Sequence, residues 1–146
     1  MNTELALDEL TTRQQQLQDA FRRHNHDGIE TKQLNNDLDR LTASFETGEQ
    51  VNLNVYVPFA IRITRIRGRT IKAIAATDNG TITFKNAAGA TIATFTATAS
   101  TTIDTDLTAQ LPTANNLIAA DSFYEMETAK STAGGKVLMT IEYIRI

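Results

Sequence analysis

The sequence predicts a mainly β protein, in which an N-terminal α-helical stem precedes an antiparallel, jelly-roll-like β-sandwich of about seven or eight strands. Apolar residues recur at helical spacing in residues 1–50. From residue 51 onward they alternate with polar residues, as they do in half-buried strands. The composition changes at the same place, from Gln, Leu, Asp and Arg to Thr, Ala, Ile and Gly. We therefore expect a stem over residues 1–50 and a sandwich over residues 51–146, divided near Thr47–Gln50.

Length and composition fit one globular domain with an appendage. The 146 residues are 41% hydrophobic and 21% charged, close to the average of globular proteins, so a disordered chain is not expected. The sequence has no apolar run of the roughly 18 residues that cross a bilayer. The N-terminal Glu4, Asp8 and Glu9 are unlike a signal peptide, and the absence of cysteine excludes disulfides and cysteine nucleophiles. We expect a soluble protein, made in a cytoplasm, with no membrane partner.

The net charge of −3 hides a difference between the two parts of the chain. Residues 1–50 contain five basic and ten acidic side chains, a balance of 5 − 10 = −5, so the remainder carries −3 + 5 = +2. A protein that neutralises many phosphates needs a strong basic excess, which neither part has. No nucleic-acid partner is expected.

The stem carries two narrow apolar stripes. Their spacings alternate between three and four residues, as on one side of a coiled-coil helix, and their members are Leu7, Leu10, Gln14, Leu17, Phe21 and His24, then Leu34, Leu38, Leu41 and Phe45. Isolated short helices are marginal in water, so each stripe needs a partner. That partner is either the second helix folded back as a hairpin or the same helix in neighbouring subunits. We favour a homo-oligomer, in which the polar Gln14 fixes the register.

The segment His24-Asn25-His26-Asp27-Gly28 separates the two stripes and holds both histidines of the chain. Asp27 can bond its own backbone and Gly28 can adopt a positive φ, so both are expected at a turn or junction. His24, His26, Asp27 and Gly28 resemble the HxHDG element that recurs in structural proteins of tailed-phage virions, where a helical stem leads into a β-rich body.

This resemblance implies a non-enzymatic component of the virion: a short fibre, a spike or a capsid decoration. By analogy with fibres, it implies a trimer that docks on other virion proteins through its stem. The rival interpretation is a receptor-binding module whose sandwich loops recognise a host-surface glycan. The two interpretations differ in class, because one is architectural and the other is ligand recognition.

The two histidines raise the question of a metal. Side chains two residues apart on an extended segment point the same way, so one chain offers two imidazoles and a threefold axis would offer six. Fibre and spike tips of tailed phages hold iron at HxH elements, which is what the resemblance implies for His24 and His26. We favour the alternative, in which the histidines bond the turn or cap the preceding helix. No other cofactor is expected.

The alternating pattern of the sandwich begins at Val51–Val57 and ends at Pro58, as expected of a half-buried strand. A weaker strand is expected around residues 122–128. The last strand, over residues 136–146, is entered through Gly134-Gly135.

Turn signals divide the strands between these two ends. The pair Asn79-Gly80 predicts a hairpin between residues 71–76 and 81–85, because both residues tolerate positive φ. The next turn is expected at Asn86–Gly89. Residues 105–116 are expected to form the longest loop and a contact surface.

Four arginines, Arg62, Arg65, Arg67 and Arg69, form the densest basic cluster. Guanidinium groups bind phosphates, acidic glycans and carboxylates, so the cluster can contact an anionic partner. Alternatively, it marks a solvated edge strand whose charges prevent pairing between molecules. The acidic stem of a neighbouring subunit, or another virion protein, would satisfy the arginines without a small ligand.

The sequence shows no catalytic constellation. It has no GxSxG, Walker-type or dinucleotide-binding glycine motif. Two carboxylate pairs, Asp104 with Asp106 and Glu125 with Glu127, have the residue types of a glycosidase site but are expected to be surface acids. The many threonines are expected on exposed sheet faces. We do not expect an enzyme.

Overall fold

The computed structural model describes residues 9–17 and 37–146. The chain divides into two compact units, Met1–Asn36 and Asp37–Ile146. Residues 9–17 of the first unit form a helix whose side chains are all exposed. No helix within the described ranges is long and apolar enough to span a bilayer. The expectations for Leu7, Phe21, His24, His26, Asp27, Gly28 and Leu34 fall outside the described residues.

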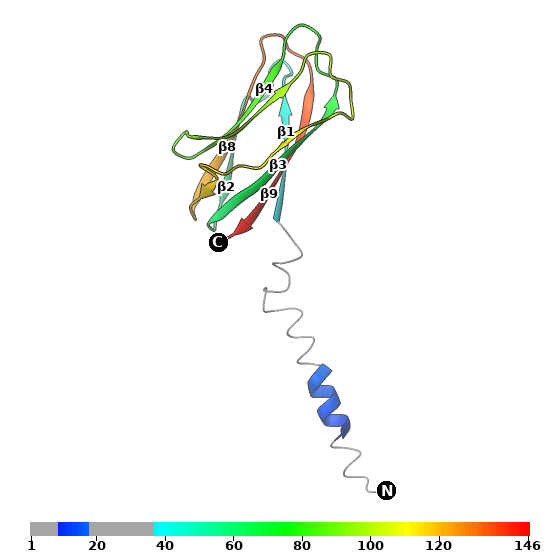
Figure 1. Ribbon diagram of the computed structural model, residues 1–146, viewed down its shortest axis with the longest axis vertical. Coiled ribbons are helices and arrows are strands. Elements are labelled where there is room, and N and C mark those ends of the chain that lie inside the picture. Colours follow the sequence, from blue (N-terminus) through cyan, green and yellow to red (C-terminus); the bar gives the residue numbers. More distant parts are fainter. Residues whose placement is uncertain (1–8, 18–36) are drawn as a thin grey trace. The chain divides into compact units, whose positions relative to one another are not determined.

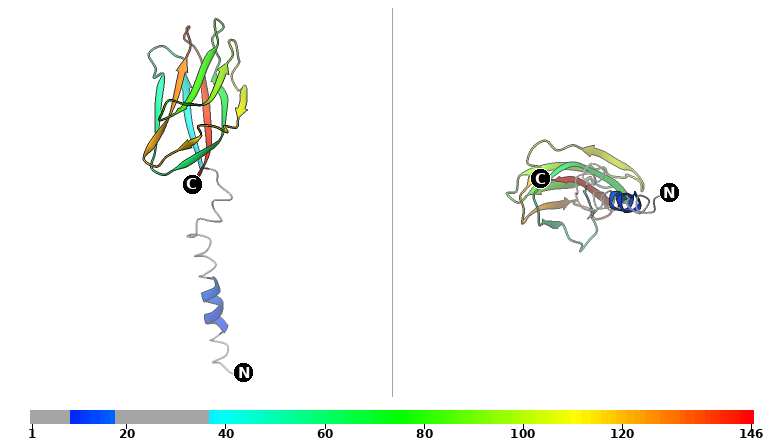
Figure 2. Two further views of the ribbon diagram at one scale, coloured as in Figure 1. Left: turned by 60° about the vertical axis from the view of Figure 1, so that its left-hand side comes forward. Right: turned by 90° about the horizontal axis from the view of Figure 1, so that it is seen from below.

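The second unit is an antiparallel sandwich of two sheets (Figure 1). Its strands are β1 (Asp37–Ser44), β2 (Asn52–Val57), β3 (Ile61–Lys72), β4 (Gly80–Asn86), β5 (Thr91–Ala97), β6 (Asp106–Gln110), β7 (Leu117–Ile118), β8 (Ser122–Ala129) and β9 (Lys136–Arg145). Sheet A has the order β1-β9-β3-β6, with the short β7 also beside β3, and sheet B has the order β2-β8-β4-β5. Figure 2 shows the sandwich from two further directions. The predicted antiparallel β-sandwich is confirmed, with slightly more strands than expected.

The strand pairs follow a nested pattern. The first strand pairs with the last, β1 with β9, and β2 pairs with β8. Farther in along the chain, β3 pairs with β6 and β4 with β5. The pairs β3–β9 and β4–β8 then join these units within each sheet.

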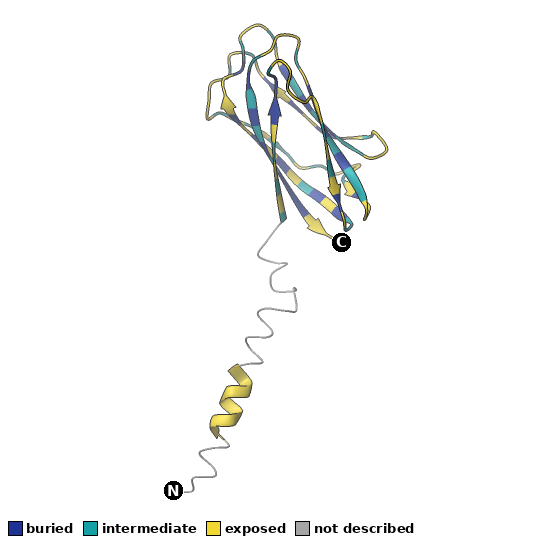
Figure 3. Cartoon of the chain, turned by 180° about the vertical axis from the view of Figure 1, so that it is seen from behind, coloured by how far each residue is buried: buried dark blue, intermediate teal, exposed yellow. Residues whose placement is uncertain are grey.

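The core lies between the sheets and is built from alternate residues of each strand, since neighbouring side chains of a strand point to opposite faces. On β3, for example, Ile61, Ile63 and Ile66 are fully buried. Phe84 of β4 and Phe95 of β5 pack edge to face, with ring centroids 6.2 Å apart and ring planes at 79°. Figure 3 shows buried and exposed positions alternating along the strands, which confirms the predicted period of two.

The predicted second helical stripe is wrong where the structure describes it. Leu38 and Leu41 lie on strand β1, which pairs with β9, and Phe45 follows directly in the core. The spacing of residues 38, 41 and 45 fits a helix, but residues 41, 43 and 45 also fit a strand, and pairing with β9 selects the second pattern. Leu41 and Ala43 therefore face the core, whereas Leu38 faces out and is 47% exposed. The sandwich begins at Asp37, before the expected boundary near residue 50.

The Asn79-Gly80 hairpin is also wrong. Strands β3 and β4 belong to different sheets, and neither residue of the pair has a positive φ. Gly80 is required for space instead, because a Cβ there would lie 2.5 Å from the ring of Phe45. The turn at Asn86–Gly89 is confirmed as the β4–β5 hairpin, in which Gly89 has a φ of +81°.

Two other predictions can be compared with the strands. The final strand entered through Gly134-Gly135 is confirmed as β9. Residues 105–116 do not form one long loop, because β6 occupies Asp106–Gln110. Short polar strands such as β6 lack the alternating apolar pattern by which β2 was predicted.

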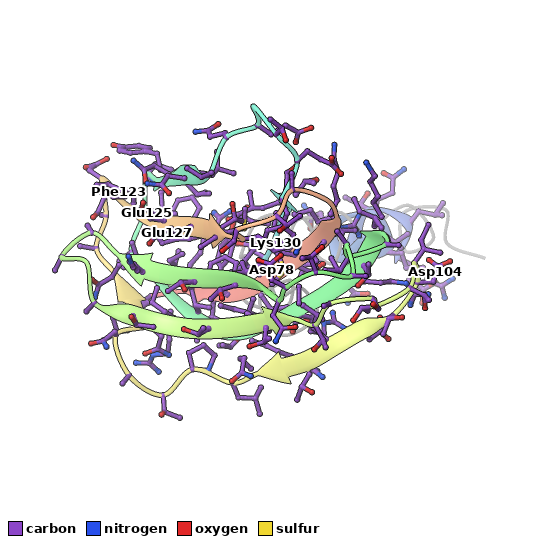
Figure 4. The ribbon with its side chains drawn as sticks, turned by 90° about the horizontal axis from the view of Figure 1, so that it is seen from above. Asp78, Asp104, Phe123, Glu125, Glu127 and Lys130 are labelled. Carbon is purple, nitrogen blue, oxygen red and sulfur yellow. The ribbon has the colours of Figure 1, made fainter. Side chains whose placement is uncertain are left out.

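The loops where β1 ends are tied together by a partly buried ion pair. The ammonium of Lys130 donates to the backbone oxygen and to Oδ1 of Asp78, both at 2.6 Å, and its side chain is 1% exposed. The backbone N–H of Ser131 donates to the same carboxylate at 2.8 Å. The bond from Lys130 is the main cause that holds the pKa of Asp78 below its ordinary value. Figure 4 labels both partners.

Thr70 of β3 gives a first test of the packing. Its side chain is fully buried, and its Oγ1 has no hydrogen-bond partner among the described residues. An unpaired buried hydroxyl costs about 1–3 kcal/mol, and valine has nearly the same shape. We therefore expect Thr70→Val to raise the free energy of unfolding by about 1 kcal/mol, measured by urea denaturation. Thr70→Ser is the control, and a less stable Thr70→Val protein would contradict the assignment.

Candidate functional site: an arginine-lined trough

The four predicted arginines lie on the outward face of sheet A. Arg62, Arg65, Arg67 and Arg69 are all exposed on β3. The step of three from Arg62 to Arg65 breaks the period of two, and the register of β3 against β9 shifts at the same place, between Ile63 and Arg65. A β-bulge adds one residue to a strand and so restores the facing of the side chains that follow. The bulge therefore keeps all four guanidinium groups on one face.

A fifth arginine joins them from another strand. Arg40 of β1 and Arg67 of β3 both pair with Thr140 of β9, one from each side. The outward face here contains a groove of about 520 Å³. The arginines that line it are Arg40, Arg65, Arg67 and Arg69, and its aliphatic lining includes Leu38 and Leu138. We call this groove the arginine trough and define it by Leu38, Arg40, Arg65, Arg67, Leu138 and Thr140.

Two of the arginines are held by acids. The Nη2 of Arg67 lies 2.5 Å from Oε1 of Glu142, whose side chain is only 11% exposed. Arg69 lies 3.2 Å from Asp106 and 3.6 Å from Asp104, so this acid pair serves as its counter-ions. Each guanidinium can still offer further N–H donors to a ligand.

The other three arginines of this face have no acidic partner among the described residues, so their guanidinium groups can bind an anion. Arg40, Arg62 and Arg65 have no ion pair with any residue that the structure describes. Arg65 lies beside Glu142 in the register, but the carboxylate is taken by Arg67. The trough thus combines uncompensated positive charge with an aliphatic lining.

Lysines beyond the trough are neutralised. At the end of β3, Lys72 contacts Glu46 at 2.5 Å, and at the start of β9, Lys136 contacts Glu49 at 2.9 Å. The bond from Lys72 lowers the pKa of Glu46. Bonds from Ser44 and then Lys136 lower the pKa of Glu49. The excess positive charge is therefore concentrated at the arginines.

The position of β3 corrects the structural interpretation of the cluster. β3 is flanked by β9 on one side and by β6 and β7 on the other, so it is not an edge strand. Its arginines therefore do not serve to prevent an exposed edge from pairing with another molecule. Sequence reasoning also missed Arg40, because it assigned residues 34–45 to a helix. The alternation of Leu38, Arg40 and Thr42 with inward residues was the available signal.

The outward face of sheet B has a different character. Its outward positions on β4 and β5 are mostly threonines, as expected for the exposed side of a pleated sheet, and include Thr81, Thr83, Thr94 and Thr96. On β8, Glu125 and Glu127 pair with Asn54 and Asn52 of β2. Glu127 accepts a short bond from Lys85, which raises the pKa of that lysine.

The described residues contain no group of three or more metal-ligating side chains. Because His24 and His26 lie outside these residues, their metal site stays a prediction. The stem positions that are described, Leu10, Gln14 and Leu17, lie on the exposed helix.

Comparisons with known proteins give likenesses of low score. No protein-family model and no curated protein matches the chain. A chain of the cyanophage Pam1 capsid asymmetric unit is 14% identical, over 75% of this chain and 82% of that one, with a TM-score of 0.45. The infectious bursal disease virus VP2 subviral particle is 18% identical over 73% of this chain, with a TM-score of 0.31, and only 32% of that longer chain is covered.

A Bacillus endospore appendage, from a family of disulfide-linked pili, is 13% identical over 77% of this chain and 95% of that one, with a TM-score of 0.32. All three TM-scores lie below 0.5.

Proposed function

We propose that this protein is a non-enzymatic structural component of a virion: an oligomeric short fibre, spike or capsid decoration with a jelly-roll sandwich. The observation that carries the proposal is the nested strand pairing, β1 with β9, β2 with β8, β3 with β6 and β4 with β5. An eight-stranded hairpin folded over into two sheets gives this pairing, if the short β7 is counted as an insertion. Jelly rolls of this kind occur in viral capsid and lectin domains.

A fold by itself does not determine a function, so the surfaces must support the proposal as well. The arginine trough and the polar outward face of sheet B are suited to contacts, and their described residues show no acid, base or nucleophile arrangement of an enzyme site. The HxHDG resemblance of residues 24–28 adds the virion context.

The exposed helix supports the oligomer. Leu10 is 61% and Leu17 is 71% exposed, and both lie on the stripe that includes Gln14. Apolar side chains two helical turns apart gain stability when another helix covers them. We propose a trimer in which this stripe is the contact, and through which the protein attaches to other virion proteins.

Light scattering of the full chain tests the oligomer. At micromolar concentration we expect a trimer, and we expect the double variant Leu10→Ser with Leu17→Ser to be monomeric. The matched control is Gln15→Ser with Gln16→Ser, which changes two exposed residues off the stripe and should remain trimeric. A monomeric native protein would contradict the trimer.

Mass spectrometry of purified particles tests the virion assignment. We expect the chain in the particles of the virus that encodes it, in many copies relative to an enzyme of the same particle. Its absence from the particles would contradict the assignment.

The second candidate is a glycan-binding receptor module, favoured by one observation. Tyr56 is 62% exposed on β2 and pairs with Phe123 of β8, and its hydroxyl donates to Asp121 at 2.9 Å. Aromatic faces beside polar groups are the usual platform for sugars. A glycan array on the full chain distinguishes this candidate, which requires a signal that Tyr56→Ala removes.

A further inference from the structure

We propose that the arginine trough of one copy receives the outward carboxylates of β8, Glu125 and Glu127, of a second copy, so that sandwiches stack sheet A against sheet B. The inference rests on the proposed function, because it names how the sandwiches of a virion component contact one another. It does not depend on the helix stripe, which is a separate contact.

Charge complementarity between the two faces is the first argument. The outward face of sheet A carries five arginines, of which three have no ion pair in the described part of the chain. On sheet B, Glu127 is paired with Lys85, whereas Glu125 lies beside Lys85 in the register and forms no salt bridge with a described residue. One face therefore offers unpaired guanidinium groups and the other offers unpaired carboxylate oxygens, which form charge-assisted bonds when they meet.

Equal spacing is the second argument. Arg65 and Arg67 are two residues apart on β3, as are Glu125 and Glu127 on β8. Because a strand rises about 3.3 Å per residue, both pairs repeat at roughly 6.6 Å. β3 and β8 are both interior strands of their sheets, so the two columns lie away from the sheet edges. Figure 4 labels Phe123, Glu125 and Glu127 along β8.

The residues at one end of the two columns are also complementary. In sheet A, Leu38 and Ile144 are exposed at the Arg62–Arg65 end of the trough. In sheet B, Tyr56 and Phe123 lie next to Glu125. When Glu125 faces Arg65 and Glu127 faces Arg67, Phe123 faces Arg62, the preceding outward residue of β3, which pairs with Ile144 of β9. A guanidinium over an aromatic ring gains a cation–π contact, so this end of the two columns is favourable as well.

The same surface suits other anionic partners less well. Sugars and nucleotide bases bind through stacking on aromatic side chains, and the lining of the trough contains none. Leu38 and Leu138 instead offer aliphatic contacts, which suit a protein face. The second copy is therefore the occupant that the lining favours.

The contact should be weak between free copies. Four strands about 4.8 Å apart and roughly six residues long present a face near 20 Å by 20 Å, or about 400 Å² per copy in projection. Interfaces of this size fall in the weak, transient class. The contact joins two different faces, so it can propagate from copy to copy, and copies held together by their stems would bind with greater avidity.

Sedimentation equilibrium of the full chain at 50 mM and 500 mM NaCl tests the stacking. We expect association beyond the stem oligomer at the lower salt and its loss at the higher salt, since exposed charges are then screened. Arg65→Glu alone and Glu125→Arg alone should each weaken this association by at least about tenfold. Arg65→Lys, which keeps the charge, is the matched control and should associate.

A charge exchange identifies the partner. The double variant Arg65→Glu with Glu125→Arg should recover association to within about threefold of the native protein, and an equimolar mixture of the two single variants should also recover it. Failure of both recoveries would overturn the pairing. So would a native protein with no salt-sensitive association, even if it is a trimer at 500 mM NaCl.

The two proposals fail separately in this design. A monomer at 500 mM NaCl with salt-sensitive stacking at 50 mM would contradict the trimer and support the trough. A heparin-derived hexasaccharide that binds the trough more than tenfold tighter than the copies bind each other would overturn the second copy as its occupant.

Discussion

Phe84→Ala should lower the free energy of unfolding by about 3–5 kcal/mol, since the truncation removes a fully buried ring and leaves a cavity. Phe84 lies at the centre of sheet B, where β4 pairs with both β5 and β8. Its edge-to-face contact with Phe95, at 6.2 Å between centroids, adds about 0.5–1.5 kcal/mol beyond the buried area. Urea denaturation at fixed protein concentration measures the loss.

The control for this variant is Tyr56→Ala, which removes an aromatic side chain of similar size from the exposed face of β2. Such a surface change should alter stability by only about 0.5 kcal/mol. Phe84→Leu keeps most of the volume and reports on the same site if the alanine variant fails to fold. Equal losses for Phe84→Ala and Tyr56→Ala would contradict the assigned core.

Tyr124→Phe should destabilise the sandwich by about 1–3 kcal/mol at pH 7, because a partly buried carboxylate loses its donor. The hydroxyl of Tyr124, on β8 of sheet B, donates to Oδ2 of Asp39 on β1 of sheet A at 2.6 Å. Tyr124 is fully buried, so this bond joins the two sheets through the core. The double variant Tyr124→Phe with Asp39→Asn tests the coupling between the two side chains. If its loss of stability equals the sum of the losses in the two single variants, the coupling is contradicted.

The same hydroxyl predicts an alkaline effect. Burial, followed by the bond to Asp39, raises the pKa of Tyr124 well above the ordinary value of 10.0. Because this pKa is higher in the folded state than in the unfolded state, the protonated hydroxyl contributes fully to the free energy of unfolding below pH 10. That contribution declines as the pH rises toward the pKa of the folded state. The native protein should therefore lose more stability between pH 9 and pH 11 than Tyr124→Phe does. Parallel pH profiles would contradict this cause.

The sandwich could be predicted from sequence where one side of a strand is apolar and the other polar. β2 and β3 show this alternation plainly, as does β9 with its preceding glycines. β1 could not be assigned in this way, because Leu38, Leu41 and Phe45 satisfy a helical spacing as well. Only the partner strand β9, distant in sequence, makes the strand the more stable choice.

The candidate site was predicted in part for a similar reason. The four arginines of β3 lie close together in the sequence, so their clustering was visible. Their common facing depends on the bulge after Ile63, and the contribution of Arg40 depends on the register across β9. Both are properties of strand pairing, which a single sequence does not specify. The Asn79-Gly80 pair shows the converse, since a strong turn signal there serves the packing of Phe45.

The antiparallel pairing of β1 with β9 has a mechanical consequence. Asp37 pairs with Tyr143, so the first strand begins where the last one ends, and the eight paired positions of β1 run from there to Ser44. A force that pulls Asp37 and Ile146 apart would peel the two strands from one end, breaking the ladder one bond after another. A load applied between Asp37 and the far loops would stretch the whole ladder in shear, with all its bonds resisting together. A sandwich held at Asp37 and pulled at its opposite end is therefore loaded along its strong direction.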